Sequence, residues 1–302
     1  MDVSVIIVNY NTADHLEKCL FSIIENTKNI DYEILICDNN SPDRDIEKLQ
    51  CKFTNVNFFF RSSNDGFGAG CNYCAGKSRG KYLLFVNPDI LIKGNAIIKF
   101  YEFMENNSEV GLCSGLQVDG DNNLQYSYNE FPDLSWEYKE AISRGTDKRI
   151  NQLLNEIIEK ANENISEVDW VIGACMFVRK VLFEKAGGFD ETFFLYYEDV
   201  DLQYRIREYG YKIIILTDVR IFHFQRSSVR DIKGSDTYFY NMHKSKLIFI
   251  KKHYGLVKRF SIRLLFIIGF SLRIITEPFR KANSAYTKTQ LKNILKLYLC
   301  NY

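Results

Sequence analysis

The sequence has few prolines, four in 302 residues, and it contains no internal repeat or low-complexity tract. Long disordered linkers are therefore not expected. Its CxxC motif, Cys71–Cys74, has neither a second cysteine pair nor a nearby histidine, which argues against a zinc site. No secretory signal precedes the first strand-like run, so we expect the eight cysteines to be free thiols in a reducing compartment, where they act as small packing residues.

The sequence also lacks a large net charge, which is only +1, but the two signs are unevenly distributed. Residues 244–302 contain thirteen Lys and Arg and one acid, Glu277. That leaves 26 of the 39 basic and 37 of the 38 acidic residues in positions 1–243, a net charge of −11. This distribution argues against a nucleic-acid binder. It favours an acidic body with a basic tail that lies on an anionic membrane.

The apolar run in the tail, Leu264–Leu272, is too short to cross a bilayer, because spanning needs about twenty residues. Arg263 and Arg273 flank the run directly. Further cations surround it: Lys258, Arg259, Arg280 and Lys281. Two interpretations stay open, an amphipathic helix in the membrane interface and a helix packed on the catalytic domain.

Four runs in the first ninety residues read as buried strands, and helices are expected between them. The runs are Val3–Val8, Tyr32–Cys37, Val56–Phe60 and Lys81–Val86. Helices are expected from Ala13, with Leu16, Cys19, Leu20, Ile23 and Ile24 on one face, from Pro42, and after the glycine-rich stretch 64–70. This alternation predicts a parallel, doubly wound α/β sheet. Ligands of such sheets bind outside the carboxyl edge, so Tyr10, Asp38 and Asn87/Asp89 should converge there, although turn chemistry alone explains each strand end separately.

The second half of the chain continues the pattern less regularly. Residues 111–118 read as a strand, and residues 119–167 as a polar insertion or lid with an amphipathic helix near 150–161. Trp170–Val178 resumes the apolar strand pattern, and Gly187–Gly188 stops a helix. Two short strands are expected at Lys212–Leu216 and Arg220–Phe224.

The segment Phe189–Leu202 places an acidic cluster among aromatic residues at the start of a helix. Apolar neighbours raise the pKa of a carboxyl group, which suits a general base, whereas the positive end of a helix lowers it. Taken alone, the segment is better explained as a helix start with acidic residues in its first turn.

As an ordered set, the motifs of residues 3–225 resemble the family 2 inverting glycosyltransferases of GT-A fold. The motifs are Val3–Asn11, Asp38–Ser41, Gly66–Gly70, Asn87–Asp89, Gly187–Asp190, Glu198–Asp201 and His223. Asn87-Pro88-Asp89 and the run from Phe193 to Asp201 look like the bacterial rhamnosyltransferase branch. Residues 119–167 and 226–302 carry no such signal.

The resemblance implies a nucleotide diphosphate sugar as donor, with its base across the first strand ends. Asp38 matches the acid that accepts the N3–H of uracil or thymine, and Tyr10 offers a stacking face. The nucleotide-binding residues implied are Val8, Tyr10, Asp38, Asn64, Gly66 and Asn87.

Asp89 matches the metal-contacting aspartate of the family's Asp-x-Asp signature, and His223 a histidine that completes the site in some relatives. A Mg²⁺ or Mn²⁺ ion there would neutralise the diphosphate leaving group. Here the sequence departs from the signature: Asn87 replaces its first acid, and an amide oxygen is a weaker ligand. For His223 a packed core histidine is an equally good explanation.

Asp199 matches the catalytic base, which takes the proton of the acceptor hydroxyl as that oxygen attacks the anomeric carbon and inverts it. Glu198 is a second catalytic residue, expected to hold a sugar hydroxyl. The sugar or acceptor is expected near Trp170, Gly173, Ala174 and Asp201.

The resemblance favours dTDP-L-rhamnose as donor and a lipid-linked saccharide as acceptor, in the synthesis of O-antigen or capsule. A UDP-hexose or UDP-galactofuranose transferase and a non-catalytic sugar-nucleotide-binding protein stay as alternatives. The location expected is cytoplasmic, peripheral at the inner face of the cell membrane, with no nucleic-acid partner. A dinucleotide-dependent oxidoreductase is disfavoured because Asn9-Tyr10-Asn11, not G-x-G-x-x-G, follows the first strand. A nucleotidyltransferase is disfavoured because no glycine-rich basic loop occurs there.

The predicted fold is thus α/β of GT-A type, a Rossmann-like, mostly parallel sheet with helices on both faces and a basic helical tail. The predicted division is a catalytic domain over 1–243 and a tail over 244–302. Within the domain, 1–118 is the nucleotide-binding half, 119–167 the insertion and 168–243 the acceptor half.

Overall fold

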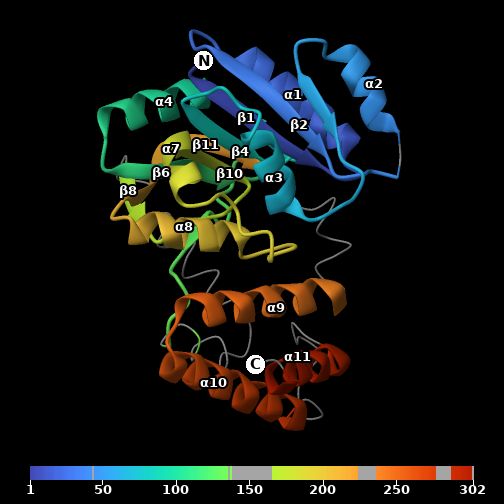
Figure 1. The fold of residues 1–302 in the computed structure, drawn as a ribbon, viewed down its shortest axis with the longest axis vertical. Coiled ribbons are helices and arrows are strands. Elements are labelled where there is room, and N and C mark those ends of the chain that lie inside the picture. Colours follow the sequence, from blue (N-terminus) through green and yellow to red (C-terminus); the bar gives the residue numbers. More distant parts are fainter. Residues whose placement is uncertain (43, 135–136, 138–164, 224–235, 277–286, 301–302) are drawn as a thin grey trace.

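The computed structural model describes residues 1–302 except 43, 135–136, 138–164, 224–235, 277–286 and 301–302 (Figure 1). The described strands of its main sheet follow the order β3 (Asn57–Phe60), β2 (Tyr32–Asp38), β1 (Val3–Asn9), β4 (Tyr82–Val86), β10 (Cys175–Arg179), β6 (Val110–Val118), β11 (Lys212–His223) and β5 (Ile90–Ile92). β8 (Ile165–Val168) also pairs with β11, and β7 (Tyr128–Asn129) pairs with β9 (Trp170–Val171) in a separate two-stranded sheet.

The β-branched, apolar runs at the start of the chain form the parallel centre of the sheet, as predicted. In β1, Ile7 pairs with Ile36 of β2 on one side and with Val86 of β4 on the other. Every residue of β1 and β4 is buried, because helices cover both faces of a parallel sheet.

The alternation of side chains along β1 divides the sheet's core into two clusters. Val5 and Ile7 pack with α1 (Ala13–Asn26), α2 (Asp45–Lys52) and α4 (Ala96–Asn106). Ile6 and Val8 point to the opposite face, where α3 (Phe67–Ala75), α7 (Lys180–Lys185) and α8 (Glu198–Glu208) cover them. This arrangement confirms the predicted fold class with helices on both faces.

The cysteines are packing residues, as predicted, with two exceptions. All eight thiols are free, and six of them are buried within these two clusters. Cys51 and Cys300 are exposed. On α1 the prediction fails at Ile24, which is 42% exposed, because it lies at the border of the helix's apolar face.

Three predicted elements differ in the structure. The run Trp170–Val178 is two strands, because residues 172–174 direct their backbone bonds to a neighbouring loop, to α8 and to the end of β4. The two strands expected near 212–224 are one strand, β11, whose register shifts between Leu216 and Arg220. The helix expected from Pro42 begins only at Asp45. Phe224 and the helix expected near 150–161 lie outside the described residues.

The sheet is mixed beyond its parallel centre. β10 is antiparallel to both β4 and β6, and β5 and β8 are antiparallel to β11. The antiparallel pairing matters for the site, because it brings the start of β10 to the same edge as the end of β4.

The basic tail forms α9 (Asp236–His253), α10 (Leu256–Thr276) and α11 (Lys288–Cys300), which lie at the end of the molecule away from the sheet, with α9 nearest to it (Figure 1). They share a third core cluster with Phe193 and Val200. One side of α10 is therefore buried in this cluster, where its main neighbour is α11. The predicted boundary at 243/244 falls inside α9, so a helix crosses it.

Candidate active site

The carboxyl ends of β1 and β2 form the first part of the site. Asn9 and Asp38 are partners in the parallel register. The buried carboxylate of Asp38 accepts hydrogen bonds from Nδ2 of Asn9 at 2.7 Å, from Oγ of Ser41 at 2.6 Å and from the Ser41 N–H at 2.9 Å. Tyr10, the next residue of the first strand end, is 47% exposed, so its ring is accessible to a ligand.

The glycine-rich loop before α3 joins this strand end to the acidic segment. Nδ2 of Asn39 donates to the Gly66 carbonyl at 2.8 Å, and Oδ1 of Asn64 accepts from the Gly66 N–H at 3.2 Å. Gly66 has a φ of +99°, and a Cβ added there would lie 2.2 Å from the carbonyl oxygen of Phe194. Only glycine fits this close approach, which brings residues 64–66 beside residue 194.

Gly66→Ala should therefore destabilise the protein by about 2–4 kcal/mol, from positive-φ strain together with the clash against Phe194. Gly94→Ala is the matched control, because Gly94 has a φ of +60° but no atom within 4 Å of an added Cβ. Chemical denaturation of the two variants measures the difference. Equal losses in both would mean that the contact with Phe194 contributes nothing.

Asp89 and His223 lie beside each other further along the carboxyl edge of the sheet. The antiparallel pairing of β5 with β11 sets His223 opposite Ile90. Its Nε2 lies 3.4 Å from Oδ2 of Asp89, and its Nδ1 lies 2.7 Å from Oε1 of Gln117. Burial opposes ionisation of Asp89, yet the hydrogen bond and charge of His223 hold the pKa of that carboxyl below its usual value.

Backbone contacts connect this position to the acidic helix. The Asn87 N–H donates to the Ala174 carbonyl at 2.9 Å, and the Gly173 N–H donates to Oδ2 of Asp199 at 2.8 Å. A Cβ on Gly173 would lie 2.8 Å from the same Oδ2, so glycine permits the approach. The segments that carry Asp38, Asp89 and Asp199 are therefore brought together at one edge of the sheet.

The two acids that begin α8 have unusual electrostatics. Burial raises the pKa of Asp199, and the N–H groups of Gly173 and Val200 lower it only in part. Burial, followed by the negative charge of Asp199, raises the pKa of Glu198 well above its usual value. The two carboxyl groups therefore disfavour each other's ionisation, and they titrate as a coupled pair. Oε2 of Glu198 has no hydrogen-bond partner among the described residues.

The turn immediately before α8, which orients Glu198 and Asp199, is strained. Tyr196 and Tyr197 have φ values of +66° and +68°, a left-handed conformation that costs about 1–2 kcal/mol for a residue with a side chain. α9 holds the turn in place: Oγ of Ser245 donates to the Leu195 carbonyl at 2.9 Å, and the Phe249 ring lies 5.7 Å from that of Tyr197. Backbone strain held by surrounding contacts is common at functional sites.

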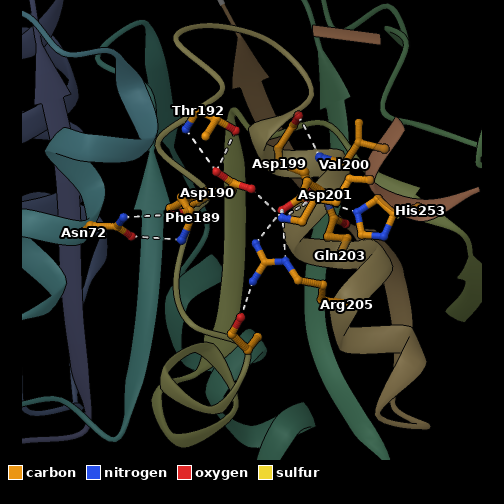
Figure 2. Close-up of polar contacts among 12 residues, drawn as sticks. Asn72, Phe189, Asp190, Thr192, Asp199, Val200, Asp201, Gln203, Arg205 and His253 are labelled. Atoms are coloured by element: carbon orange, nitrogen blue, oxygen red, sulfur yellow. Dashed lines mark hydrogen bonds and ion pairs between the residues drawn. The ribbon is translucent and has the colours of Figure 1, made fainter. Parts of the chain in front are cut away.

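Asp201 does not have the position that the sequence suggested. Its carboxylate is fully buried and is engaged by Nη2 of Arg205 at 2.6 Å, Nζ of Lys252 at 2.9 Å and Nε2 of His253 at 2.7 Å. Arg205, Asp201 and His253 appear together in Figure 2. The structure thus favours a structural anchor between α8 and α9 over the expected contact with the sugar or acceptor.

Three more predicted site residues have side chains committed to packing. Val8 is 7% exposed and contacts Gly70 of α3, and Ala174 is 1% exposed. The Trp170 indole N–H donates to the Glu130 carbonyl at 2.9 Å, while its ring packs against the third core cluster. Val8 and Ala174 can therefore meet a ligand only through their backbones.

Sequence reasoning missed two side-chain amides that fix the site (Figure 2). Asn72 of α3 donates to the Phe189 carbonyl at 2.8 Å and accepts its N–H at 2.9 Å. Gln203 of α8 makes the same two-bond pairing with Val171, at 2.8 and 2.7 Å. No local pattern marks either amide, because each partner lies in a segment remote in sequence.

A mostly parallel α/β sheet with acidic residues gathered at its carboxyl edge is the GT-A arrangement of sugar-nucleotide-dependent transferases. The chain belongs to glycosyl transferase family 2, whose profile matches residues 4–186. It is therefore a glycosyltransferase, an enzyme class that transfers sugars from nucleotide sugars.

Two curated proteins and one solved structure illustrate the similarity. The chain is 26% identical over 265 residues to the N-acetylglucosaminyl-diphospho-decaprenol L-rhamnosyltransferase of Mycobacterium tuberculosis, covering 83% of this chain and 85% of that protein. It is 27% identical over 219 residues to the rhamnosyltransferase WbbL of Escherichia coli, covering 70% and 79%. The mannosyltransferase PcManGT of Pyrobaculum calidifontis, in complex with GDP-Man and Mn²⁺, has the same fold, with a TM-score of 0.60, 14% identity and coverage of 98% and 84%.

Two features of the described residues bear on membranes and metal ions. None of the helices there combines the length and the apolar character that crossing a membrane requires. In the same ranges, no cluster of three or more His, Cys, Asp and Glu side chains could hold a metal ion.

Proposed function

We propose that the protein moves a sugar, with inversion, from a nucleotide diphosphate donor to a saccharide acceptor. One observation carries the proposal: the segments bearing Asp38, Asp89 and Asp199 converge at the carboxyl edge of the sheet. Those of Asp38 and Asp89 lie at the carboxyl ends of the strands on either side of β1, and Asp199 is joined to them through residues 173–174. Ligands of such sheets bind outside that edge.

Asp38 and Tyr10 suit the base of the donor. Three hydrogen bonds fix the Asp38 carboxylate, and a carboxylate has about four acceptor positions, so one is left for the N3–H of uracil or thymine. The exposed ring of Tyr10 offers a stacking face beside it. Asn64 and Gly66 border the same end of the sheet, through Asn39.

Asp89 and His223 fit a divalent cation, and Asn87 lies two residues before Asp89 in the same turn after β4. A carboxylate and an imidazole are suitable ligands, and Mg²⁺ and Mn²⁺ commonly take one or two protein ligands together with phosphate oxygens. Gln117 bonds Nδ1 of His223 and so turns Nε2 toward Asp89. When bound, Mg²⁺ or Mn²⁺ would neutralise the charge of the diphosphate leaving group.

Asp199 is the proposed base. As the acceptor oxygen bonds to the anomeric carbon and the bond to the diphosphate breaks, the hydroxyl proton passes to Asp199. The N–H groups of Gly173 and Val200 fix the carboxylate at 2.8 and 2.9 Å. Glu198 has an unpartnered oxygen, Oε2, that suits a sugar hydroxyl.

The donor sugar proposed is L-rhamnose as its dTDP derivative, and the acceptor a lipid-linked saccharide of O-antigen or capsule synthesis at the cytoplasmic face of the membrane. The names of the two relatives support this choice, since both are rhamnosyltransferases and one acts on a diphospho-decaprenol substrate. UDP-hexose and UDP-galactofuranose are the alternative donors. The domain division proposed is a catalytic domain ahead of α9, with its nucleotide half ending at β6, and a tail that begins with α9.

A thermal-shift panel tests nucleotide and metal binding. UDP or dTDP with Mn²⁺ or Mg²⁺ at a hundredfold excess over Kd should stabilise the protein by about 2.7 kcal/mol, roughly 5–10 °C in Tm. NAD, NADP and ATP should leave Tm unchanged. Asp89→Asn should lose the part of the shift that depends on the metal.

Asp218→Asn is the matched control for this panel, because Asp218 lies on β11, the strand that carries His223, and makes an exposed ion pair with Lys99 of α4. It should respond to nucleotide and metal as the unsubstituted protein does. Stabilisation by NAD or ATP in place of UDP or dTDP would contradict the proposal.

A further inference from the structure

The helix α10 is apolar on two opposite sides, and only one of them is covered. Its inner side packs into the third core cluster through Ile262, Phe266 and Phe270. The outer side stays exposed: Val257 is 82% exposed, Phe260 68%, Leu264 43%, Ile268 49%, Leu272 53% and Ile275 67%. Residues three and four apart share one side of a helix, so these six form one continuous stripe, here called the outer stripe.

Charged residues of α10 are turned away from the outer stripe. Arg263 donates to the carbonyls of Tyr298 and Leu299 at the end of α11. Arg273 lies 5.6 Å from the Phe270 ring on the inner side, and Lys258 lies 3.6 Å from the Tyr254 ring. The helix therefore presents apolar side chains outward, while three of its four cations are held against the protein.

An uncovered stripe of six large apolar side chains is unlike the scattered exposed apolar residues of ordinary surfaces. α10 has 21 residues and is thus about 30 Å long. The outer stripe runs along almost the whole helix, and α10 lies at the end of the molecule farthest from the sheet (Figure 1). This geometry suits a helix lying flat in an interface rather than one crossing it.

The charge of α10 and α11 indicates which kind of partner covers the outer stripe. α10 and α11 together carry seven Lys and Arg and no acidic residue. On α11, Lys288, Lys292 and Lys296 are exposed and four residues apart, so they form a basic row. Such a row attracts an anionic bilayer, whereas the like charges of a second copy of this chain would oppose self-association.

We propose that the outer stripe and the lysine row dock the enzyme on an anionic bilayer, with α10 lying in the plane of the headgroups. The inference deepens the proposed function, since a lipid-linked acceptor lies in the same bilayer, but the docking itself requires neither donor nor transfer. α9 links the docked helices to the turn that aims Asp199, through Ser245 and Phe249.

Flotation of the full chain with vesicles tests the docking. The protein should float with vesicles of phosphatidylcholine and phosphatidylglycerol, and far less with phosphatidylcholine alone. The double substitution Leu264→Asp with Ile268→Asp should lower vesicle affinity at least tenfold. Val181→Asp is the matched control, because Val181 is 72% exposed on α7, and it should float as the unsubstituted protein does.

Replacing Lys288, Lys292 and Lys296 by Gln should weaken binding to the anionic vesicles roughly a hundredfold, since each lysine near such a surface contributes a factor of about five. The same loss should appear on raising the salt concentration.

Three results would overturn the docking proposal. These are no flotation at low salt, unchanged flotation of the double variant, or a dimer in lipid-free buffer that the double variant converts to a monomer. The last would assign the outer stripe to a second copy of the chain. Flotation without any sugar transfer would leave the docking intact and count against the proposed function alone.

Discussion

Asp199→Asn is expected to lower kcat about a thousandfold while leaving the Kd for UDP or dTDP nearly unchanged. General-base catalysis contributes roughly 10²–10⁴-fold, and an amide cannot take the acceptor proton. Asparagine has the size of aspartate, and its carbonyl oxygen can still accept the Gly173 N–H, so the turn should stay in place. Turnover with a donor panel and calorimetric titration of the nucleotide measure the two effects separately.

Asp190→Asn provides the matched control on the same segment. Asp190 carries the same functional group, but its carboxylate pairs with Lys252 at 2.5 Å and is partly exposed. Burial opposes its ionisation, yet hydrogen bonds from Lys252 and Thr192 lower the pKa of Asp190 to about 2. Its substitution should change kcat little. If Asp199→Asn lost nucleotide binding with the fold intact, Asp199 would belong to the donor or metal site instead.

The pH dependence of kcat should carry the signature of the same residue. Transfer needs ionised Asp199, so the rate should rise with pH through the pKa of the Asp199–Glu198 pair. Because burial raises the pKa of Asp199, this increase in kcat should occur at a higher pH than it would for an ordinary aspartate. In the Asp199→Asn variant, the residual kcat should no longer increase over this pH range.

Asp201→Asn should destabilise the protein by about 3 kcal/mol, a fall in Tm of roughly 5–10 °C. The substitution removes the negative charge that Arg205 and Lys252 share at a fully buried carboxylate, and it leaves these two cations partly uncompensated. Because these contacts of Asp201 join α8 to α9, the loss of stability should be accompanied by a lower kcat with little change in KM. Asp190→Asn is again the control, since a partly exposed ion pair contributes about 1 kcal/mol or less.

The shifted pKa of Asp201 determines how its contribution to the free energy of unfolding changes with pH. Burial opposes its ionisation, but His253, Arg205 and Lys252 hold its pKa below the usual value. Its contribution is therefore complete above the unfolded pKa, about 4, and is lost as pH falls through the lower folded pKa. The stability difference between the protein and Asp201→Asn should shrink on acidification below pH about 4. A constant difference would contradict the ion-pair account.

The parallel centre of the sheet could be predicted from sequence because its signal is local. Runs such as Val3–Val8 are typical of strands buried on both faces of a parallel sheet, and the polar ends of such strands share one edge. For the same reason Tyr10, Asp38 and Asp89 could be predicted to converge, whereas the place of Asp199 at the same site followed only from the family resemblance. The break between β9 and β10 at Gly173 could not be predicted, because the backbone hydrogen bonds of residues 172–174 go to partners that no local pattern identifies.

The supports of the site were also beyond sequence reasoning. Asp201 looked like a companion of Asp199, since the two lie in one acidic cluster. Positions two apart on a helix point in different directions, however, and only the packing of α9 shows that Asp201 faces His253. Gln203 and Asn72 were missed because their partners are backbone groups of other segments.

A crystal structure of the complex with dTDP or UDP and Mn²⁺ tests the central claim most directly. The account predicts the base beside Asp38 and Tyr10, the diphosphate beside Asp89 and His223, and the Asp199 carboxylate facing the position of the transferred sugar. A nucleotide bound away from the carboxyl edge of the sheet, or with Asp199 on a surface remote from the diphosphate, would contradict it.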